Sequence, residues 1–467
     1  MYCQAWFARA SGLLRRLAAA GGLQKWSRVS WFAALAGFVL ASCASYSDHT
    51  KEARSALDAG NADKALKLYN ERLEVKSAKE LPKELGGDNT LLVLERSMIL
   101  QQLQQYELSS RDMQVADKQI EILDFDRKAI DDIGKYLFSD STGPYKAPFY
   151  EKLLINTENM LNYLQTNDLN GARIEARRLA VMQSFIANHE GQGASLIGPG
   201  SYLAGFIFEK SGDAQEALRY YDEALQFGAF PSLAPVVVRL GARASYRTPR
   251  ITKLLDANAG GPAGPEEPAE LLIVVNNGRV PAKIPKRVPI GLALTYASAF
   301  ISPAQAAQAN ELALQGLVTW INYPALDKER PVSPPLVTVD GSQQPVELAL
   351  AVDSEARKAW DDAQGALVAS AITRMITRVL AGQVAKKAGG DSTVGMLLSL
   401  GTQVALTAND VPDTRSWGTL PARIAIARLV LEPGKHEVQV SVSGSVRKQT
   451  VELAPGGWAV VGVTNLR

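Results

Sequence analysis

The hydrophobic pattern of the chain changes about halfway along its length. From residue 52 to about residue 255, apolar residues recur at spacings of three and four, which predicts α-helices. From residue 270 onward, apolar and polar residues alternate in short runs that end in Asn-Gly, Asp-Gly, Pro-Gly or Gly-Gly, which predicts strands and tight turns. The pattern therefore predicts a multidomain α+β chain with a helical first half and a β-rich second half.

Two segments of the helical half, 52–73 and 201–231, share one order of small and aromatic residues. Small residues let two helices approach closely, while aromatic side chains fill the groove between neighbouring pairs. The order resembles the tetratricopeptide repeat (TPR), so we expect a TPR-like helical solenoid over residues 52–255, with a generic helical bundle as the alternative. The expected repeat-packing residues are Ala53, Ala65, Tyr69, Gly205, Phe208, Ala217, Tyr221 and Ala224.

The second half is expected to be a separate β-rich domain. Residues 256–269 are dense in Gly, Pro and Ala, which is typical of a linker. We predict strands from Leu271, Pro289, Pro334, Arg423 and Lys448, which would form one antiparallel β-sandwich or meander within residues 270–467. A helical stretch at 354–409 interrupts them, and we expect a helical hairpin docked on the sheet. The alternative is that this hairpin contacts a second protomer or a membrane.

The first residues have the order of a secretory signal. Several Arg and Lys residues precede the apolar run 31–40, and the first carboxylate in the chain is Asp48. The apolar run is shorter than the roughly 18 residues that indicate a membrane-spanning helix. Residues 1–42 are therefore predicted to be a signal peptide, followed by a polar tether at 43–51.

The run Leu40, Ala41, Ser42 and Cys43 resembles the lipobox of bacterial lipoproteins. The resemblance implies that Cys43 receives a diacylglyceryl group, that the chain is cut before it, and that the new amino terminus is acylated. Several acyl chains of this kind anchor a protein stably. Ala44 and Ser45 lack the aspartate that retains such proteins at the inner membrane, so the periplasmic face of the outer membrane is the expected location.

Composition narrows the classes of function. Among 467 residues, 50 are basic and 48 acidic, and a formal charge of +2 gives no reason to expect nucleic-acid binding. The three histidines, His49, His189 and His436, have neither metal-ligand nor triad spacing, and no nucleophile motif is present. We therefore expect no enzyme, cofactor or metal site. A glycan-processing enzyme is the alternative, because its carboxylate pair needs no sequence motif.

Two segments, 271–285 and especially DTRSWGTLPARIAIARLVLEPGKHEV at 413–438, resemble an uncharacterised family of proteobacterial lipoproteins with a TPR-like N-terminal half. Members of that family are discussed alongside lipoproteins that activate penicillin-binding proteins. The resemblance therefore implies a role in cell-envelope, peptidoglycan-related assembly rather than catalysis.

Candidate partner-binding residues lie in two places. Tyr145 and Tyr150 flank a Gly- and Pro-containing loop at 140–152, and Arg415 and Trp417 lie in the DTRSW segment. The alternative is that the tyrosines pack into the core, that Trp417 fills a junction of helix and sheet, and that Arg415 pairs with Asp413. The sequence as a whole predicts a lipid-anchored scaffold that binds protein partners. The alternative binding function is a subunit of an oligomeric envelope complex, with the chain as a homo-oligomer.

Overall fold

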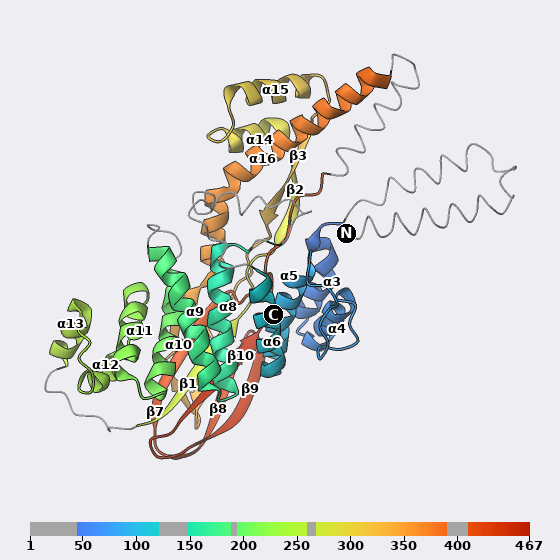
Figure 1. The fold of residues 1–467 in the computed structure, drawn as a ribbon. Coiled ribbons are helices and arrows are strands. Elements are labelled where there is room, and N and C mark those ends of the chain that lie inside the picture. The colour runs from blue at the N-terminus through green and yellow to red at the C-terminus, as the bar shows by residue number, and fades with distance from the viewer. Residues whose placement is uncertain (1–43, 121–144, 146, 188–193, 259–267, 390–409) are drawn as a thin grey trace.

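The computed structural model describes residues 44–120, 145, 147–187, 194–258, 268–389 and 410–467. Within these residues the fold is mixed α+β, with helices in the first half and most strands in the second (Figure 1). The predicted α+β class is confirmed.

The helical half is built from consecutive helices that pack in pairs. Each pair is joined by a short connection, and several connections use a residue with positive φ, such as Gly60 and Gly212. The pairs are α3 (Tyr46–Asp58) with α4 (Ala62–Arg72), α5 (Asn89–Gln102) with α6 (Tyr106–Gln119), α8 (Phe149–Gln165) with α9 (Leu169–Ala187), α10 (Ile197–Lys210) with α11 (Ala214–Phe227), and α12 (Leu233–Gly241) with α13 (Pro249–Ala257).

The predicted tether at 43–51 is wrong over most of its length. Helix α3 begins at Tyr46, because Ser45 caps it: the Ser45 hydroxyl accepts from the Asp48 backbone amide, and the Asp48 carboxylate accepts from the Ser45 amide. The expected linker at 256–269 is also shorter than predicted, since α13 continues through Ala257 and β1 begins at Ala269.

Eight of the ten described strands form two four-stranded sheets. The first sheet has the order β10 (Trp458–Asn465), β1 (Ala269–Asn277), β7 (Arg423–Leu431) and β6 (Glu347–Ala351). The second has the order β5 (Ser342–Gln344), β4 (Leu336–Val339), β8 (Gly434–Val442) and β9 (Ser445–Leu453). The expectation of a purely antiparallel arrangement is wrong, because β1 and β10 pair in parallel. Parallel pairing needs a long crossover, and nearly the whole second half of the chain separates these two strands.

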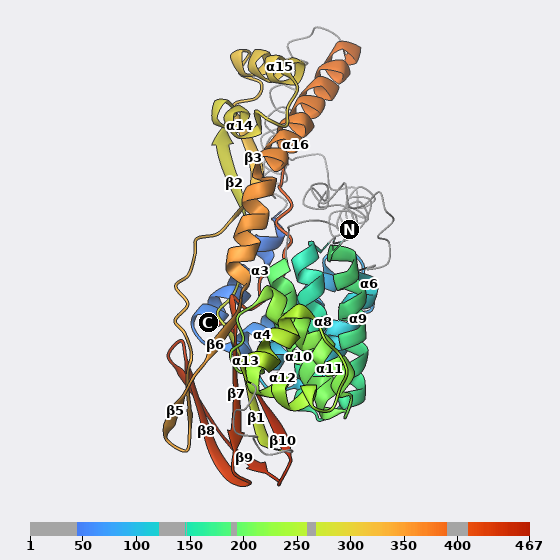
Figure 2. The same cartoon turned by 90° about the vertical axis from the view of Figure 1, so that its left-hand side faces the viewer.

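Alternate side chains of β1 point to opposite faces of the first sheet, so this strand contacts the helices on one face and the second sheet on the other. Leu272 and Val274 face the helices and belong to the core they share with the first sheet, whereas Leu271, Ile273 and Val275 face the second sheet. All residues of β1 are buried. The helices cover one face of the first sheet and the second sheet covers the other (Figure 2).

A separate lobe stands above this three-layered body in both views (Figures 1 and 2). It is formed by β2 (Lys283–Pro289), α14 (Ile290–Ala297), α15 (Pro303–Leu314), β3 (Trp320–Leu326) and α16 (Val352–Gly389), where β2 and β3 form an antiparallel pair. The lobe has its own core, to which Tyr323 of β3 and Val368 and Ile372 of α16 contribute.

Two predictions for the residues of this lobe are wrong. The segment after Pro289 is helix α14 rather than a strand, because Ile290, Ala293 and Ala297 recur at helical spacing and are the residues it buries. The predicted insertion at 354–409 begins as α16, which packs mainly against α14 and β3 instead of docking on the large sheets. Residues 390–409, the second part of that predicted hairpin, lie outside the described residues.

Candidate functional site

The DTRSW segment lies buried where the N-terminal helices meet the sheet. Trp417 is completely buried, and its indole Nε1 donates to Thr419 Oγ1 at 3.1 Å. Thr414 Oγ1 accepts from the backbone amide of Ser47 in α3 at 3.0 Å. The segment therefore fixes the start of α3 to the second half of the chain.

Two buried glutamates hold the backbone of this segment. Glu95 of α5 accepts from the Gly418 amide at 3.0 Å and from the Thr419 amide at 2.7 Å, one on each carboxylate oxygen. Glu151 of α8 accepts from the Trp417 amide at 3.0 Å. A carboxylate is acceptor-only when ionised, so each of these groups matches the amides that face it. Three consecutive backbone amides are thus satisfied by helical side chains rather than by a sheet ladder.

Burial shifts the pKa of both carboxyl groups upward. Burial raises the pKa of Glu151 to about 7, against the opposing effect of hydrogen bonds from Tyr145 and Trp417. Burial also raises the pKa of Glu95, and the hydrogen bonds from Thr419 and Gly418 oppose that shift. Beside them, burial lowers the pKa of the Lys283 ammonium, and the Glu151 charge counteracts this effect.

The four candidate partner-binding residues are all buried, so none of them lies on a surface that is open to a partner. The hydroxyls of Tyr145 and Tyr150 both donate to Glu151, the second at 3.4 Å. Arg415 Nη2 lies 2.8 Å from the Asp413 carboxylate, and the Arg415 side chain is 2% exposed. The aromatic side chains complete the core, and Asp413 of the same segment neutralises the charge of Arg415. This agrees with the alternative stated from the sequence, in which these residues have a packing role.

A second buried polar cluster joins the helices to the strands β1 and β7. Arg428 of β7 donates through Nη2 to Glu209 of α10 at 2.8 Å and to Glu270 of β1 at 2.6 Å. Arg239 of α12 bridges the same two carboxylates at 2.7 and 2.9 Å. Lys210 also contacts both. Three cations therefore surround two carboxylates in what we call the ionic cluster.

The cations of the ionic cluster control the charge of its carboxylates. Burial alone would raise the pKa of Glu209, but Arg428, Lys210 and Arg239 outweigh it and hold the pKa well below its usual range. The guanidinium of Arg428 also lies over the Phe206 ring, 5.2 Å from its centroid. Both glutamates are thus held ionised inside the protein.

A third polar cluster lies at the other end of β1. The Asn276 amide donates to Gln101 of α5 at 3.1 Å and to Glu158 of α8 at 2.5 Å, and Thr464 of β10 donates to the same Gln101 oxygen at 2.6 Å. Burial raises the pKa of Glu158 to about 7. Polar contacts at both ends of the helix-facing row of β1 fix how the helices sit on the sheet, because a shift would leave buried groups unpaired.

The expected repeat-packing residues are all buried. Two helical pairs pack closely at a glycine: a Cβ added to Gly171 of α9 would lie 2.3 Å from Cε1 of Tyr163, and one added to Gly205 of α10 would lie 2.4 Å from Cδ1 of Tyr221. Phe208 stacks on Tyr220 with ring centroids 5.3 Å apart. Tyr221 also reaches the ionic cluster, since its hydroxyl donates to Glu209 at 2.6 Å. The small and aromatic positions therefore bring helices together and also connect them to the sheet.

The buried glutamates and Arg428 were not among the residues singled out from the sequence. A signal exists for two of them: Glu95 interrupts the apolar run LLVLERSMIL together with Arg96, and Arg428 interrupts IAIARLVL. A charge in such a run must find a partner when the run is buried. Cys43 and the lipobox residues Leu40, Ala41 and Ser42 lie outside the described residues.

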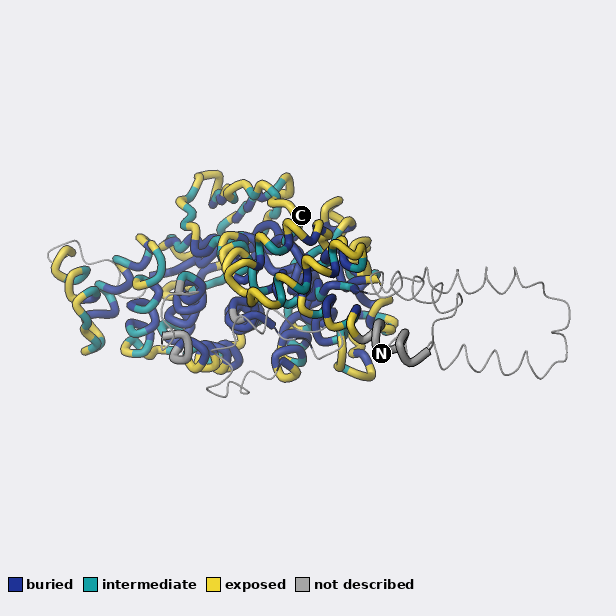
Figure 3. The backbone as a smooth tube through the Cα atoms, turned by 90° about the horizontal axis from the view of Figure 1, so that it is seen from above, coloured by how far each residue is buried: buried dark blue, intermediate teal, exposed yellow. Residues whose placement is uncertain are grey.

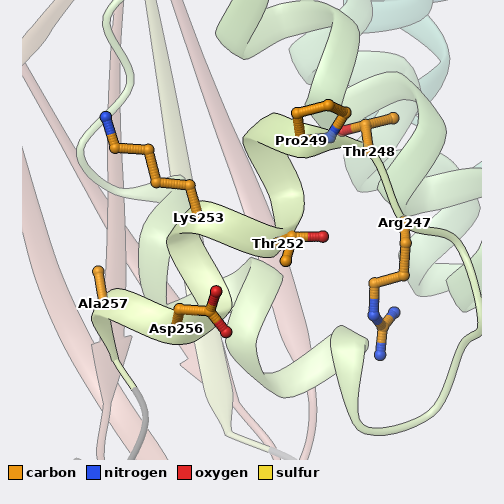
Figure 4. Close-up of a pocket in the computed structure, with 7 residues that line it drawn as sticks. All are labelled: Arg247, Thr248, Pro249, Thr252, Lys253, Asp256 and Ala257. Atoms are coloured by element: carbon orange, nitrogen blue, oxygen red, sulfur yellow. The ribbon is translucent and has the colours of Figure 1, made fainter.

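The surface hollows offer little chemistry. One hollow lies along α13 and is lined by residues 247–257. Its two cationic side chains, Arg247 and Lys253, point in different directions (Figure 4). The Arg247 guanidinium already donates to three backbone carbonyls. A second hollow, of about 220 Å³, lies between α3 and α4 and includes His49, Glu52 and Arg72. Neither arrangement defines a reaction.

Over the described part of the chain, no set of three or more His, Cys, Asp and Glu side chains is grouped closely enough to hold a metal ion. Across the same residues, no helix combines the length and the apolar character needed to cross a bilayer. The chain matches no protein-family model and no curated protein.

Proposed function

We propose that this protein is a lipid-anchored periplasmic scaffold of the outer membrane. In this proposal Cys43 carries the lipid, and the helical pairs act as a TPR-like solenoid that binds protein partners in cell-envelope assembly. The pairs that pack small residues against aromatic ones, such as Gly205 against Tyr221, support the solenoid part of the proposal.

The binding surface of such a scaffold would be the side of the helices that faces away from the sheet. The sheet-facing side is already occupied by β1, β7, β10 and the DTRSW segment, whose residues share the core of the helical half. A partner peptide therefore has no access to that side. This differs from a free solenoid, whose concave face is open.

One row of residues on α9 carries the proposal. Ile174, Arg177 and Val181 are exposed and recur at intervals of three and four, so they lie on one helix face. Arg178 beside them is exposed too, but it already pairs with carboxylates of its own chain. Ile174 is 53% exposed and Val181 is 60% exposed. Exposed aliphatic side chains beside arginines suit an apolar partner surface with acidic groups at its edge.

The start of α3 supports close attachment to a membrane. Only Ala44 and Ser45 separate Cys43 from α3, and Tyr46 and Ser47 are buried against the body. A lipid on Cys43 would thus hold the folded protein within a few residues of the bilayer. Labelled fatty acid tests the anchor: wild-type protein should incorporate it, and Cys43→Ser should not.

In-cell photo-crosslinking tests the binding surface. A photoreactive residue at Ile174 should capture a defined set of envelope proteins, and Arg177→Glu in the same chain should reduce that capture. The matched control is the same photoreactive residue at Val446, which is 61% exposed on β9. Identical capture from both positions, or none from Ile174, would contradict the proposal. Tyr145 and Tyr220 are unsuitable positions because both are buried.

A further inference from the structure

We propose that the lobe formed by β2, α14, α15, β3 and α16 is a self-association surface that docks onto the lobe of a second copy of this chain. The proposal goes beyond the scaffold function, which concerns the helical half and its partners.

The part of the lobe formed by α14, α15 and β3 is almost free of charge, whereas β2 and α16 carry exposed charged residues such as Arg287 and Lys358. Residues 288–326 contain one charged residue, Glu311. Half of the residues of α15 are nevertheless exposed. The view from above, from the side on which the lobe stands, shows many exposed residues, in yellow, near the centre of the molecule (Figure 3). Surfaces that face only water commonly have roughly a quarter to a third charged residues, so this one has the composition of an interface.

The described residues of the chain cover helix α15 only in part. It buries only Ala309 and Leu312, although it is 12 residues long. At its end Leu314 is 91% exposed, and near its start Phe300 is 55% exposed. Leu292 and Trp320, each 42% exposed, extend the apolar surface onto α14 and β3. A second layer over α15 would remove these side chains from water.

The core of the lobe is itself thin. Many of its buried residues are alanines, among them Ala293, Ala297, Ala309 and Ala371. Alanine buries little apolar area, so each such position contributes less than a larger aliphatic residue would. Association would therefore stabilise a part of the chain whose own packing is weak.

The composition of α15 favours a second copy over a membrane. Helices that lie in a bilayer interface carry Lys or Arg on the polar face and large apolar residues on the other. The sequence of α15, PAQAAQANELAL, has no basic residue, and its exposed positions include Ala304 and Ala307. Small side chains allow two helices to approach closely.

The lack of charge also favours identical partners. In a two-fold interface each residue near the axis meets its own copy, so charges there would repel. A neutral surface avoids this repulsion, whereas it offers nothing to select a partner of complementary charge. Two copies of the α15 surface can therefore bury each other's exposed apolar side chains without charge repulsion.

Co-purification of two differently tagged full-length copies from mild detergent tests the proposal. The wild-type copies should recover each other, and the double variant Phe300→Asp, Leu314→Asp should reduce recovery at least tenfold. The matched control is Val446→Asp, a change of the same kind at an exposed aliphatic residue outside the lobe. Ala307→Trp, which adds bulk on the exposed face of α15, provides a second variant, and thermal melting of each protein shows that it is folded.

Several outcomes would overturn the proposal. These are a monomeric wild-type protein, equal recovery with folded lobe variants, and binding of the lobe to vesicles of phosphatidylethanolamine and phosphatidylglycerol without dimer formation. Crosslinking from Ile174 reports on the scaffold function separately, so failure of either proposal leaves the other testable.

Discussion

Glu95 and Thr419 bond to each other twice across the junction of the two halves of the chain. The Thr419 amide donates to Glu95 Oε2 at 2.7 Å, and the Thr419 hydroxyl donates to the Glu95 backbone carbonyl at 3.0 Å. Both residues are almost fully buried. The pair fixes the DTRSW segment to α5, and hence the strands to the helices.

Substitution by glutamine should destabilise the protein more at Glu95 than at Glu151. Glu95→Gln places an NH₂ group against one of the backbone amides of Gly418 and Thr419, neither of which can reorient, so we expect a loss of about 1–3 kcal/mol in unfolding free energy. Glu151→Gln should cost less at neutral pH, because the Tyr145 hydroxyl can rotate to accept. Urea unfolding measures both. A larger loss for the Glu151 variant would contradict this account.

Glu151 should make stability depend on pH. Its pKa is about 7 in the folded protein and near 4.3 when unfolded, so the folded state binds the proton more tightly. Its contribution is fully present below about pH 4 and is lost as pH rises to about 7, by on the order of 3 kcal/mol. Relative to wild type, Glu151→Gln should therefore become more stable as pH rises from 5 to 8. Glu84→Gln, at an exposed position, should follow the wild-type curve.

Gly205 should tolerate no side chain. In Gly205→Ala the new Cβ would overlap the Tyr221 ring, so the helices must separate at a cost of about 1–3 kcal/mol. Gly291→Ala is the matched control: it is also helical, but nothing lies within 4 Å of the added Cβ, and helix propensity should make it neutral or stabilising by up to about 1 kcal/mol. Urea midpoints compare the two. Equal effects would show that close packing at Gly205 is unimportant.

Removing Arg428 should leave buried carboxylates insufficiently paired. Arg428→Met keeps the length of the side chain but removes the most buried of the three cations around Glu209 and Glu270, and we expect a loss of about 3–5 kcal/mol. Lys435→Met removes a cation that is 73% exposed and 3.9 Å from Glu452, and it should change stability by less than about 0.5 kcal/mol. Unfolding should be measured in urea, because guanidinium chloride is a salt and would screen the charges of the cluster.

The same cluster should make the stability of the protein fall in acid. The pKa of Glu209 is lowered in the folded state, so its contribution is present above its ordinary pKa near 4.3 and is lost as pH falls below that value. Stability curves from pH 7 down to pH 3 should therefore fall less steeply in Arg428→Met than in wild type. A steeper fall in the variant would contradict the assignment.

The sequence by itself determined the secondary-structure class and the positions that small and aromatic residues occupy in the helical pairs, because both follow from local periodicity. Local pattern misassigned the segment after Pro289, where a short apolar run fits strand and helix alike and only the spacing of Ile290, Ala293 and Ala297 decides. Pairing of β1 with β10, burial of Trp417 and the partners of Arg428 depend on residues far apart in the chain. Only the tertiary structure decided these, because hydrogen bonds and charges that are satisfied across the junction of helix and sheet leave no periodic trace in either segment alone.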